Sequence, residues 1–389
     1  MILALAAIVV HPAAAATVAT QFHHGPDHLG VFDGPSPGNL LKTVWTAELG
    51  SYTVASPVVA DGVLYIGGKS GALAALDAKT GARLWTFQAD GPVSATVAVA
   101  DAMVFFQSAQ NTVFAVDAKT GRQVWRHATG PTLAFYSGPP GFPEGVNWDF
   151  WTSSPLYDNG VVFIGSGDGQ VYALDARTGV QRWAFATGQR VRATPASDGK
   201  TIYVGGFDGN FYALDARSGR ERWRFKTEGN AYFPVGSIQS SAALAGSLVL
   251  FGSRDFNLYA LDARTGRKVW GNLHKESWAT ATPAVLDGRV YEGSSDGHFE
   301  RAVDLKTGTE IWTRPTDSNV YSSAAINGGA LYVGTFGGTI ARARLSDGKG
   351  GGLIFQERIY ASPWIEDGIA YFATADGTIY ALSNGDLPK

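Results

Sequence analysis

The sequence predicts an all-β fold, an eight-bladed β-propeller built from four-stranded antiparallel blades. Three observations lead to this prediction. The segment from Leu73 to Trp85 returns along the chain, in most cases after roughly 40 to 45 residues, a period typical of propeller blades. The composition includes 49 glycines, which indicates many tight turns. The last repeat lacks a strand that the N-terminal part of the chain supplies.

The N-terminus begins with an apolar stretch from Ile2 to Val10, followed by three small residues at 14–16. This order is typical of a secretory signal peptide and its cleavage site. No later run reaches the roughly 20 apolar residues that a membrane-spanning helix needs. We therefore expect a periplasmic or secreted protein with a signal peptide over 1–16, an N-terminal arm over 17–42 and a single propeller domain over 43–389.

Three histidines, His23, His24 and His28, lie close together in the predicted arm. Imidazoles are common zinc ligands, but Asp27 is the one further conventional ligand nearby and no helix fixes the spacing. We interpret this segment as a solvated arm and predict no metal site.

Each repeat contains an outer hairpin whose turn reads Asp-Ala-Lys/Arg-Thr/Ser-Gly. The Asp carboxylate can accept hydrogen bonds from backbone amides ahead of it, and the Gly can adopt the positive φ that closes the turn. A tryptophan ends most of these hairpins, and a side chain of that size is expected to pack between neighbouring blades. The structural tryptophans are Trp45, Trp85, Trp125, Trp183, Trp223, Trp270 and Trp312.

An inner hairpin precedes each outer one and is marked by turns such as Asp61-Gly62. The two hairpins together make the four strands of a blade. A serine or threonine stands before the first strand of each repeat. The sequence has eight such residues, which predicts eight blades. They are Ser56, Thr96, Ser154, Thr194, Ser241, Thr282, Ser323 and Ser362.

The eighth repeat ends at Ser383 without a fourth strand, whereas Thr43 to Leu49 reads as a fourth strand with no blade before it. We expect this N-terminal strand to complete the last blade, because closure removes an exposed edge. The seventh repeat departs from the pattern, with Gly350 to Gly352 in its outer hairpin and Phe355 near the tryptophan position. It should be the weakest blade of the ring.

The repeated motif A-x-D-x-x-T-G-x-x-x-W resembles the tryptophan-docking repeat of the pyrroloquinoline quinone (PQQ)-like propeller family, and the resemblance covers Thr43 to Ser383. Its first copy consists of Ala75, Asp77, Thr80, Gly81 and Trp85. In blade number and size the chain is similar to the propeller subunit of the outer-membrane β-barrel assembly machinery. Those subunits are typically lipoproteins, but this sequence has no cysteine, so we expect no lipid anchor.

The connections between blades and the turns in the middle of each blade are expected at one face of the ring. Side chains two and four residues before the repeated Ser/Thr point the same way along an extended segment, so we expect them to line the axial mouth. This mouth would be polar, aromatic and locally cationic. Its predicted binding residues are Arg190, Arg192, Gln239, Trp278, Tyr321, Arg358 and Tyr360, with Thr280 beside them.

Two connections at this face are longer than the others. The first, over 128–152, contains Trp148 and Trp151, and the second, over 228–241, contains Tyr232 and Phe233. Aromatic side chains beside arginines could stack a planar anionic ligand or hold a partner protein. They could equally fold down as a plug that completes the core. The sequence leaves both interpretations open.

The formal net charge of -3, without blocks of like charge, excludes the basic surface that nucleic-acid binding needs. None of the common hydrolase, metalloprotease or phosphate-loop motifs is present, and the absence of cysteine excludes a cysteine nucleophile. We therefore predict a non-catalytic extracytoplasmic scaffold without a cofactor that binds a protein partner, for example in outer-membrane protein assembly.

The sequence leaves two alternatives to the scaffold. Resemblance to quinoprotein dehydrogenases implies PQQ with calcium over the mouth, its carboxylates paired with Arg190, Arg192 or Arg358, and oxidation of an alcohol or sugar. The cysteine pair, acidic calcium site and catalytic base of those longer enzymes cannot be placed in this sequence. The other alternative is a lectin that stacks a glycan on the aromatic insertion.

Overall fold

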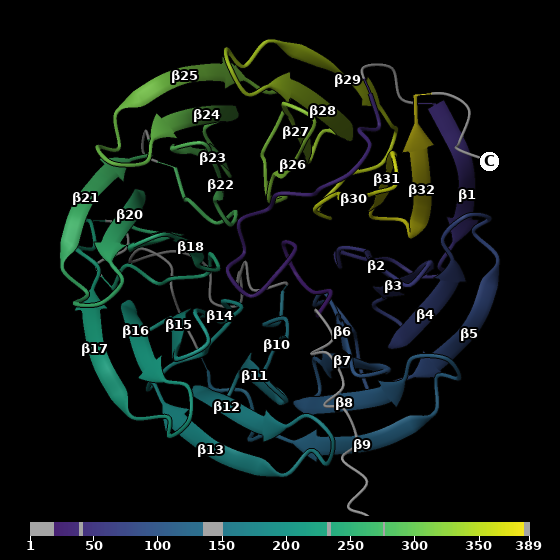
Figure 1. Ribbon diagram of the computed structural model, residues 1–389, viewed down its shortest axis with the longest axis horizontal. Helices are drawn as coiled ribbons and strands as arrows, with labels where there is room; N and C mark the ends of the chain where they lie inside the picture. The colour runs from purple at the N-terminus through teal and green to yellow at the C-terminus, as the bar shows by residue number, and fades with distance from the viewer. Residues whose placement is uncertain (1–18, 39–41, 135–150, 232–234, 275–276, 385–389) are drawn as a thin grey trace, which may run out of the picture.

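The structure, a computed structural model, describes residues 19–38, 42–134, 151–231, 235–274 and 277–384. Eight four-stranded antiparallel sheets are arranged as blades around a central axis (Figure 1), which confirms the predicted eight-bladed propeller. The predicted signal peptide and Trp148 lie outside the described residues. Within those residues, no helix is long and apolar enough to cross a bilayer.

The first four blades follow one another along the chain, each from its inner to its outer strand. Blade 1 comprises β2 (Val58–Ala60), β3 (Val63–Gly67), β4 (Ala72–Asp77) and β5 (Arg83–Gln88). Blade 2 comprises β6 (Ala98–Ala100), β7 (Met103–Ser108), β8 (Thr112–Asp117) and β9 (Gln123–Ala128). Blade 3 comprises β10 (Leu156–Asp158), β11 (Val161–Gly165), β12 (Gln170–Asp175) and β13 (Gln181–Ala186). Blade 4 comprises β14 (Ala196–Ser197), β15 (Thr201–Gly205), β16 (Asn210–Asp215) and β17 (Glu221–Lys226).

The last four blades continue around the ring in the same order. Blade 5 comprises β18 (Ala243–Ala245), β19 (Leu248–Gly252), β20 (Asn257–Asp262) and β21 (Lys268–Leu273). Blade 6 comprises β22 (Ala284–Leu286), β23 (Arg289–Gly293), β24 (Phe299–Asp304) and β25 (Glu310–Pro315). Blade 7 comprises β26 (Ala325–Asn327), β27 (Ala330–Gly334), β28 (Thr339–Arg344) and β29 (Gly350–Ile354). Blade 8 comprises β30 (Trp364–Glu366), β31 (Ile369–Ala373), β32 (Thr378–Ser383) and β1 (Lys42–Glu48).

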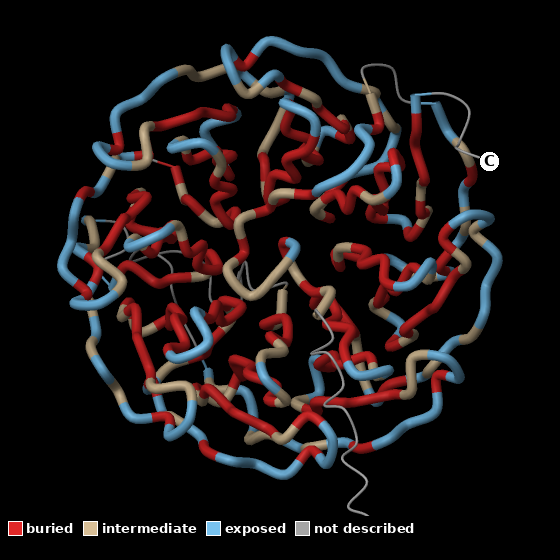
Figure 2. The backbone as a smooth tube through the Cα atoms, viewed as in Figure 1, coloured by how far each residue is buried: buried red, intermediate tan, exposed pale blue. Residues whose placement is uncertain are grey.

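Strand β1 closes the ring by pairing antiparallel with β32, from Lys42 opposite Ser383 to Glu48 opposite Thr378. The predicted completion of the last blade by the N-terminal strand is therefore confirmed. Figure 2 shows that buried residues concentrate on the inner and middle strands, whereas the outer strands and turns are largely exposed. The core thus lies between the faces of adjacent blades.

Each repeated tryptophan contacts the turn of the next blade. The indole Nε1 of Trp85, for example, donates to the carbonyl oxygen of Ala118 at 3.0 Å. The turn glycine of that next blade, Gly121, has a φ of 68°, and a Cβ placed on it would lie 2.6 Å from the Trp85 ring. The other indoles donate to Ala78, Ala176, Ala216, Ala263, Leu305 and Leu345.

The joint between blades 7 and 8 is built differently. Ala75 is paired with Trp85 in blade 1, but the residue of blade 7 at that register position, Arg342, is paired with Gly351. The Arg342 guanidinium lies over the Tyr332 ring at 5.9 Å, and the Tyr332 hydroxyl donates to the carbonyl oxygen of Gly38. The N-terminal arm therefore occupies, at this joint, the place that a blade turn takes elsewhere.

The N-terminal arm, residues 19–38, runs across the inner strands of the ring (Figure 1). Carbonyl oxygens of Asp27, Leu29 and Gly30 accept hydrogen bonds from backbone amides of β18, β22 and β26. The interpretation of this segment as a solvated arm was wrong, because His23 is 5% exposed and His28 is fully buried. The arm packs on the inner strands because its carbonyl oxygens satisfy amides of strands that have no further strand beside them.

Candidate functional site

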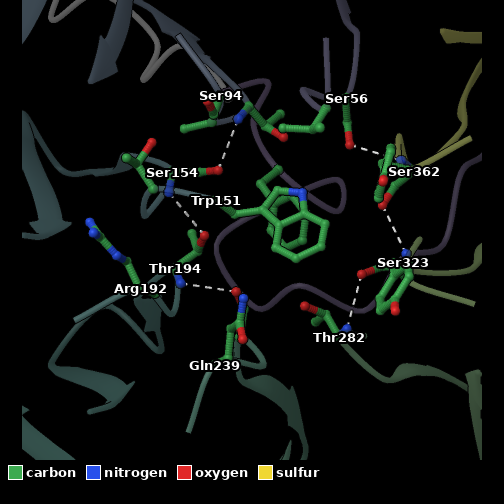
Figure 3. Close-up of a pocket in the computed structure, with 18 of the residues that line it drawn as sticks. Ser56, Ser94, Trp151, Ser154, Arg192, Thr194, Gln239, Thr282, Ser323 and Ser362 are labelled. Atoms are coloured by element: carbon green, nitrogen blue, oxygen red, sulfur yellow. Dashed lines mark hydrogen bonds between the residues drawn. The ribbon is translucent and has the colours of Figure 1, made fainter. Parts of the chain in front are cut away.

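A cavity of about 90 Å³ lies on the propeller axis and is the candidate site. Its wall is formed by the residues that precede the inner strands, and Phe22 of the arm lines it from the side of the arm. Trp151 lies in the middle of the cavity in Figure 3. The axis is therefore a pocket between the arm and Trp151.

The repeated Ser and Thr residues surround this cavity, and hydrogen bonds link neighbouring ones at six of the eight blade junctions. The backbone amide of Thr96 in blade 2 donates to Ser154 Oγ of blade 3 at 3.1 Å, and the Ser154 amide donates to Thr194 Oγ1 at 3.1 Å. Figure 3 shows these bonds. The same bond joins Thr194 to Ser241, Thr282 to Ser323, Ser323 to Ser362 and Ser362 to Ser56. The repeated Ser/Thr position, from which the sequence predicted eight blades, thus joins neighbouring blades at the axis.

Trp151 belongs to the long connection between blades 2 and 3, yet it contacts blades on the far side of the mouth. Its ring centroid lies 5.8 Å from that of Tyr321 and 5.9 Å from that of Tyr360, and the two tyrosines stack at 6.0 Å. Trp151 therefore packs on aromatic rings at the axis, and both interpretations of the aromatic insertion stay predictions. The rest of the aromatic insertion, 135–150, lies outside the described residues.

An arginine and a phenylalanine extend this group of rings. The Arg358 guanidinium lies 4.4 Å from the centroid of Phe336, whose ring meets Tyr360 edge-on at 5.5 Å. We call Trp151, Tyr321, Phe336, Tyr360 and Arg358 the mouth cluster. Burial raises the pKa of Tyr321 to about 12, so its hydroxyl is neutral at physiological pH.

The other predicted mouth residues precede blades 4, 5 and 6. Arg190 is 9% exposed, and its Nε donates to the Leu133 carbonyl oxygen at 2.6 Å. Gln239 Oε1 accepts from Arg254 at 2.6 Å, and the Trp278 ring stacks on the same guanidinium at 4.7 Å. Arg192 and Gln239 line the axial cavity, whereas Arg190, Trp278 and Arg358 do not.

Sequence reasoning missed Arg254 and Phe336. Arg254 is 1% exposed, and its guanidinium lies between the rings of Phe207 and Trp278. Both missed residues stand in the middle turns of their blades, where blade 3 carries the Gly-Asp-Gly of 167–169 but blade 4 carries Phe207. A bulky side chain in a middle turn was the signal that could have found them, and Phe207 shares it.

The residues around the axis do not fit PQQ. Pockets for organic ligands usually measure about 300 Å³ or more, and the cavity under Trp151 is about 90 Å³. Among the described residues that line it, none carries a carboxylate that could bind calcium. Within the described ranges no group of three or more His, Cys, Asp or Glu side chains could hold a metal ion.

Comparison with known proteins identifies similar chains. The family model described as outer membrane protein assembly factor BamB matches residues 42–141, 142–350 and 301–387. A protein of that name from Nitrosomonas eutropha is 26% identical over 118 residues, which is 29% of this chain and 28% of the relative. This match therefore spans less than a third of the relative's length.

Two solved structures share the fold. BamB from Moraxella catarrhalis is 19% identical, with a TM-score of 0.72 over 90% of this chain and 99% of that one. Quinohemoprotein alcohol dehydrogenase from Comamonas testosteroni is 16% identical, with a TM-score of 0.77 over 97% of this chain and 82% of that one. At such identities the likeness concerns the fold alone, and the same fold accompanies different activities.

Proposed function

The chain belongs to the family described as outer membrane protein assembly factor BamB, and from that premise we propose that it is a periplasmic, non-catalytic scaffold that holds a protein partner during outer-membrane protein assembly. The family match carries this proposal, because it covers nearly all of the propeller. The alternative of a PQQ-dependent dehydrogenase finds no support in the size and lining of the axial cavity.

The mouth cluster supports a role in holding a protein. Trp, Tyr and Arg side chains dominate the binding energy of protein interfaces: Trp and Tyr bury large areas at a low cost in conformational entropy, and Arg adds directed hydrogen bonds and stacking. In the mouth cluster these residue types are already fixed by mutual stacking, and they come from blades 7 and 8 together with the connection before blade 3. A partner that covers the mouth would meet a preorganised surface.

Site-specific photo-crosslinking tests the proposed surface. Tyr52 is 41% exposed beside the mouth, where its ring meets Tyr360, whereas Leu84 is 52% exposed on the outer strand β5. A photoreactive phenylalanine analogue at Tyr52 should crosslink to a component of the outer-membrane assembly machinery in cells. The same analogue at Leu84 is the matched control and should give no such product.

A functional test accompanies the crosslink. Cells that lack this protein should contain less folded outer-membrane β-barrel protein, and the unaltered chain should restore the amount. The double variant Trp151→Ala/Arg358→Ala should restore it poorly, whereas Arg83→Ala on β5 should restore it fully. Full restoration by the double variant, together with crosslinks from Leu84 alone, would move the interface away from the mouth.

A further inference from the structure

The outer strand of blade 7, β29, lies at the rim of the ring (Figure 1) and lacks the features that protect the other outer strands from pairing. A strand edge offers unpaired amides and carbonyls to a further strand, and charged side chains, prolines and β-bulges commonly block such pairing. In every other blade the outer strand carries a charged side chain, and its pairing with the neighbouring strand shifts register. Strand β29 reads Gly-Gly-Gly-Leu-Ile, pairs with β28 without a shift, and has no strand on its outer side among the described residues.

The backbone of β29 presents a regular row of hydrogen-bonding groups on this outer side. The Phe355 amide donates inward to the Gly338 carbonyl oxygen at 2.7 Å. Because successive residues of a strand alternate in direction, Gly350, Gly352 and Ile354 direct their amides and carbonyls outward. Ile354 is 82% exposed, the highest value for a large apolar side chain in the described part of the chain. The edge is thus flat, uncharged and apolar at its end.

A hollow of about 190 Å³ lies beside this edge, between blades 6 and 7. Gly352 and Ile354 line it together with Ala341 of β28 and Arg314 of β25. Ala341 stands at a register position that holds a tyrosine in blades 3, 4 and 5, where the ring contacts the outer strand of the preceding blade. These tyrosines are Tyr172, Tyr212 and Tyr259, with ring centroids 5.7, 5.3 and 5.3 Å from those of His127, Phe185 and Phe225.

The charges around the hollow favour a neutral aromatic ring over an ion. Arg314 Nε donates to the buried carboxylate of Glu300 at 2.6 Å, so the positive charge is balanced within the protein. Asp317, the other charged residue among the described lining, accepts from Thr339 Oγ1 at 2.7 Å. Arg314 Nη2 is buried without a hydrogen-bond partner among the described residues, and the face of an aromatic ring is attracted to a guanidinium.

We propose that β29 pairs with an extended strand of a partner protein, and that an aromatic side chain of this strand enters the hollow over Gly352. The outward groups of Gly350, Gly352 and Ile354 bind the backbone of the added strand, which supplies affinity, and the hollow supplies specificity. An aromatic ring that covers an edge glycine also stabilises the pairing of the two strands. No residue of the mouth cluster lines this hollow, so the site is separate from the interface proposed at the mouth.

Fluorescence anisotropy of labelled peptides with the full chain tests the proposal. The peptides alternate Thr and Val around a central Phe, Tyr or Trp, and at least one of the three should bind saturably. The same peptide with a central Ala should bind about tenfold more weakly, because it leaves the hollow empty.

A proline substitution on β29 tests the strand pairing. Ile354→Pro removes one outward amide and gives β29 the residue that blade 6 has at this register position, Pro315. It should weaken binding of the aromatic peptide by about tenfold or more. Leu273→Pro is the matched control, because Leu273 holds the same register position on β21 and is 66% exposed. This variant should bind the peptide as the unaltered chain does.

A substitution on β28 tests the hollow. Ala341→Tyr gives blade 7 the tyrosine of blades 3 to 5, so it should bring the affinities for the aromatic and alanine peptides to within about threefold of each other. If Ala341→Tyr does not fold, the two proline variants still decide the proposal. Ile354→Pro should also leave the crosslink from Tyr52 at the mouth unchanged, so the two proposed sites can fail separately.

Three outcomes would overturn the proposal. They are the absence of saturable binding by every aromatic peptide, equal binding by Ile354→Pro and the unaltered chain, and a dimer in sedimentation that Ile354→Pro converts to a monomer. The last outcome would assign the edge of β29 to a second copy of this chain.

Discussion

At the scale of single residues, the contact between a tryptophan and a glycine sets the distance between neighbouring blades. Gly121 and Gly160 both have positive φ, at 68° and 74°. A Cβ on Gly121 would lie 2.6 Å from the Trp85 ring, whereas a Cβ on Gly160 would meet nothing within 4 Å. The pair therefore separates the effect of crowding from the effect of backbone conformation.

We predict that Gly121→Ala lowers the free energy of unfolding by about 1 to 3 kcal/mol more than Gly160→Ala does. Both substitutions bear the cost of a positive φ, but Gly121→Ala alone pushes the indole away from its carbonyl acceptor. Urea unfolding of the two variants measures the difference. Equal losses of stability would mean that the blades adjust their spacing freely.

Burial of two arm histidines makes stability depend on pH. His23 Nδ1 and Nε2 lie 2.6 and 2.8 Å from the carbonyl oxygens of His28 and Ala324, contacts that favour the protonated ring. Burial outweighs them and lowers the pKa of His23 to about 4, and it lowers the pKa of His28 to about 3. Both rings are therefore neutral in the folded protein at neutral pH.

The unfolded chain protonates these rings near pH 6.5, so unfolding takes up protons at any pH between about 6.5 and 4. We predict that the free energy of unfolding falls as the pH drops through this window, by up to roughly 1.4 kcal/mol per pH unit for each histidine. Urea unfolding from pH 7.5 to 4.5 measures the slope. A His23→Gln/His28→Gln variant should show a flatter dependence, and an unchanged slope would exclude these residues as its source.

At the scale of elements, blade 6 has an ionic interior where other blades are apolar. Arg301 and Glu292 are 1% and 4% exposed, and Arg301 Nε donates to Glu292 Oε1 at 2.6 Å. By register these residues take the positions of Ala74 and Ile66 in blade 1. Asn272 on β21 of blade 5 accepts a further bond from Arg301, so the pair also joins two blades.

We predict that Arg301→Ala destabilises the protein by about 3 to 5 kcal/mol, because the buried Glu292 carboxylate loses its arginine and keeps only His274, whose Nε2 lies 3.5 Å away. The double variant Glu292→Ile/Arg301→Ala restores the residues of blade 1 and should recover most of that loss. Thermal and urea unfolding of the single and double variants provide the double-mutant cycle. A double variant less stable than Arg301→Ala would show that the ion pair is required by the packing of blade 6.

The seventh blade shows how a departure from the repeat is accommodated. Its outer strand β29 is the one outer strand of the described blades that carries no charged side chain, and it has glycine in place of the docking tryptophan. Phe355, just beyond the strand, packs against Phe372 and Tyr380 of blade 8 at 5.1 and 4.7 Å. The sequence indicated the departure, but the compensating contacts come from blade 8 and the arm.

At the scale of the whole molecule, the arm and the Trp151 side chain leave little space on the axis. We predict that calorimetric titration with PQQ, with and without calcium, gives no saturable heat, because the cavity of about 90 Å³ is too small and none of its described lining residues is Asp or Glu. Tight binding that is lost in the variant Arg190→Ala/Arg192→Ala would contradict this prediction and place the cofactor over the mouth.

The sequence by itself determined the blade count, the blade boundaries and the closure by the N-terminal strand. Each of these follows from patterns that are local in the sequence. The Asp-to-Gly turn and the alternation of strand residues mark every blade, and the missing fourth strand of the last repeat marks the closure. The alternation of side chains also brought Arg192, Gln239, Tyr321 and Tyr360 to the axis, and all four line the cavity.

Only the tertiary structure decided how the axis is filled. His28, Phe22 and Trp151 are distant along the chain from the inner strands they meet, and no periodicity connects an arm or an insertion to a particular blade. Their places depend on which backbone amides and ring faces the closed propeller leaves uncovered. These uncovered amides and ring faces exist only once all eight blades have assembled, so a pattern within a single repeat cannot encode them.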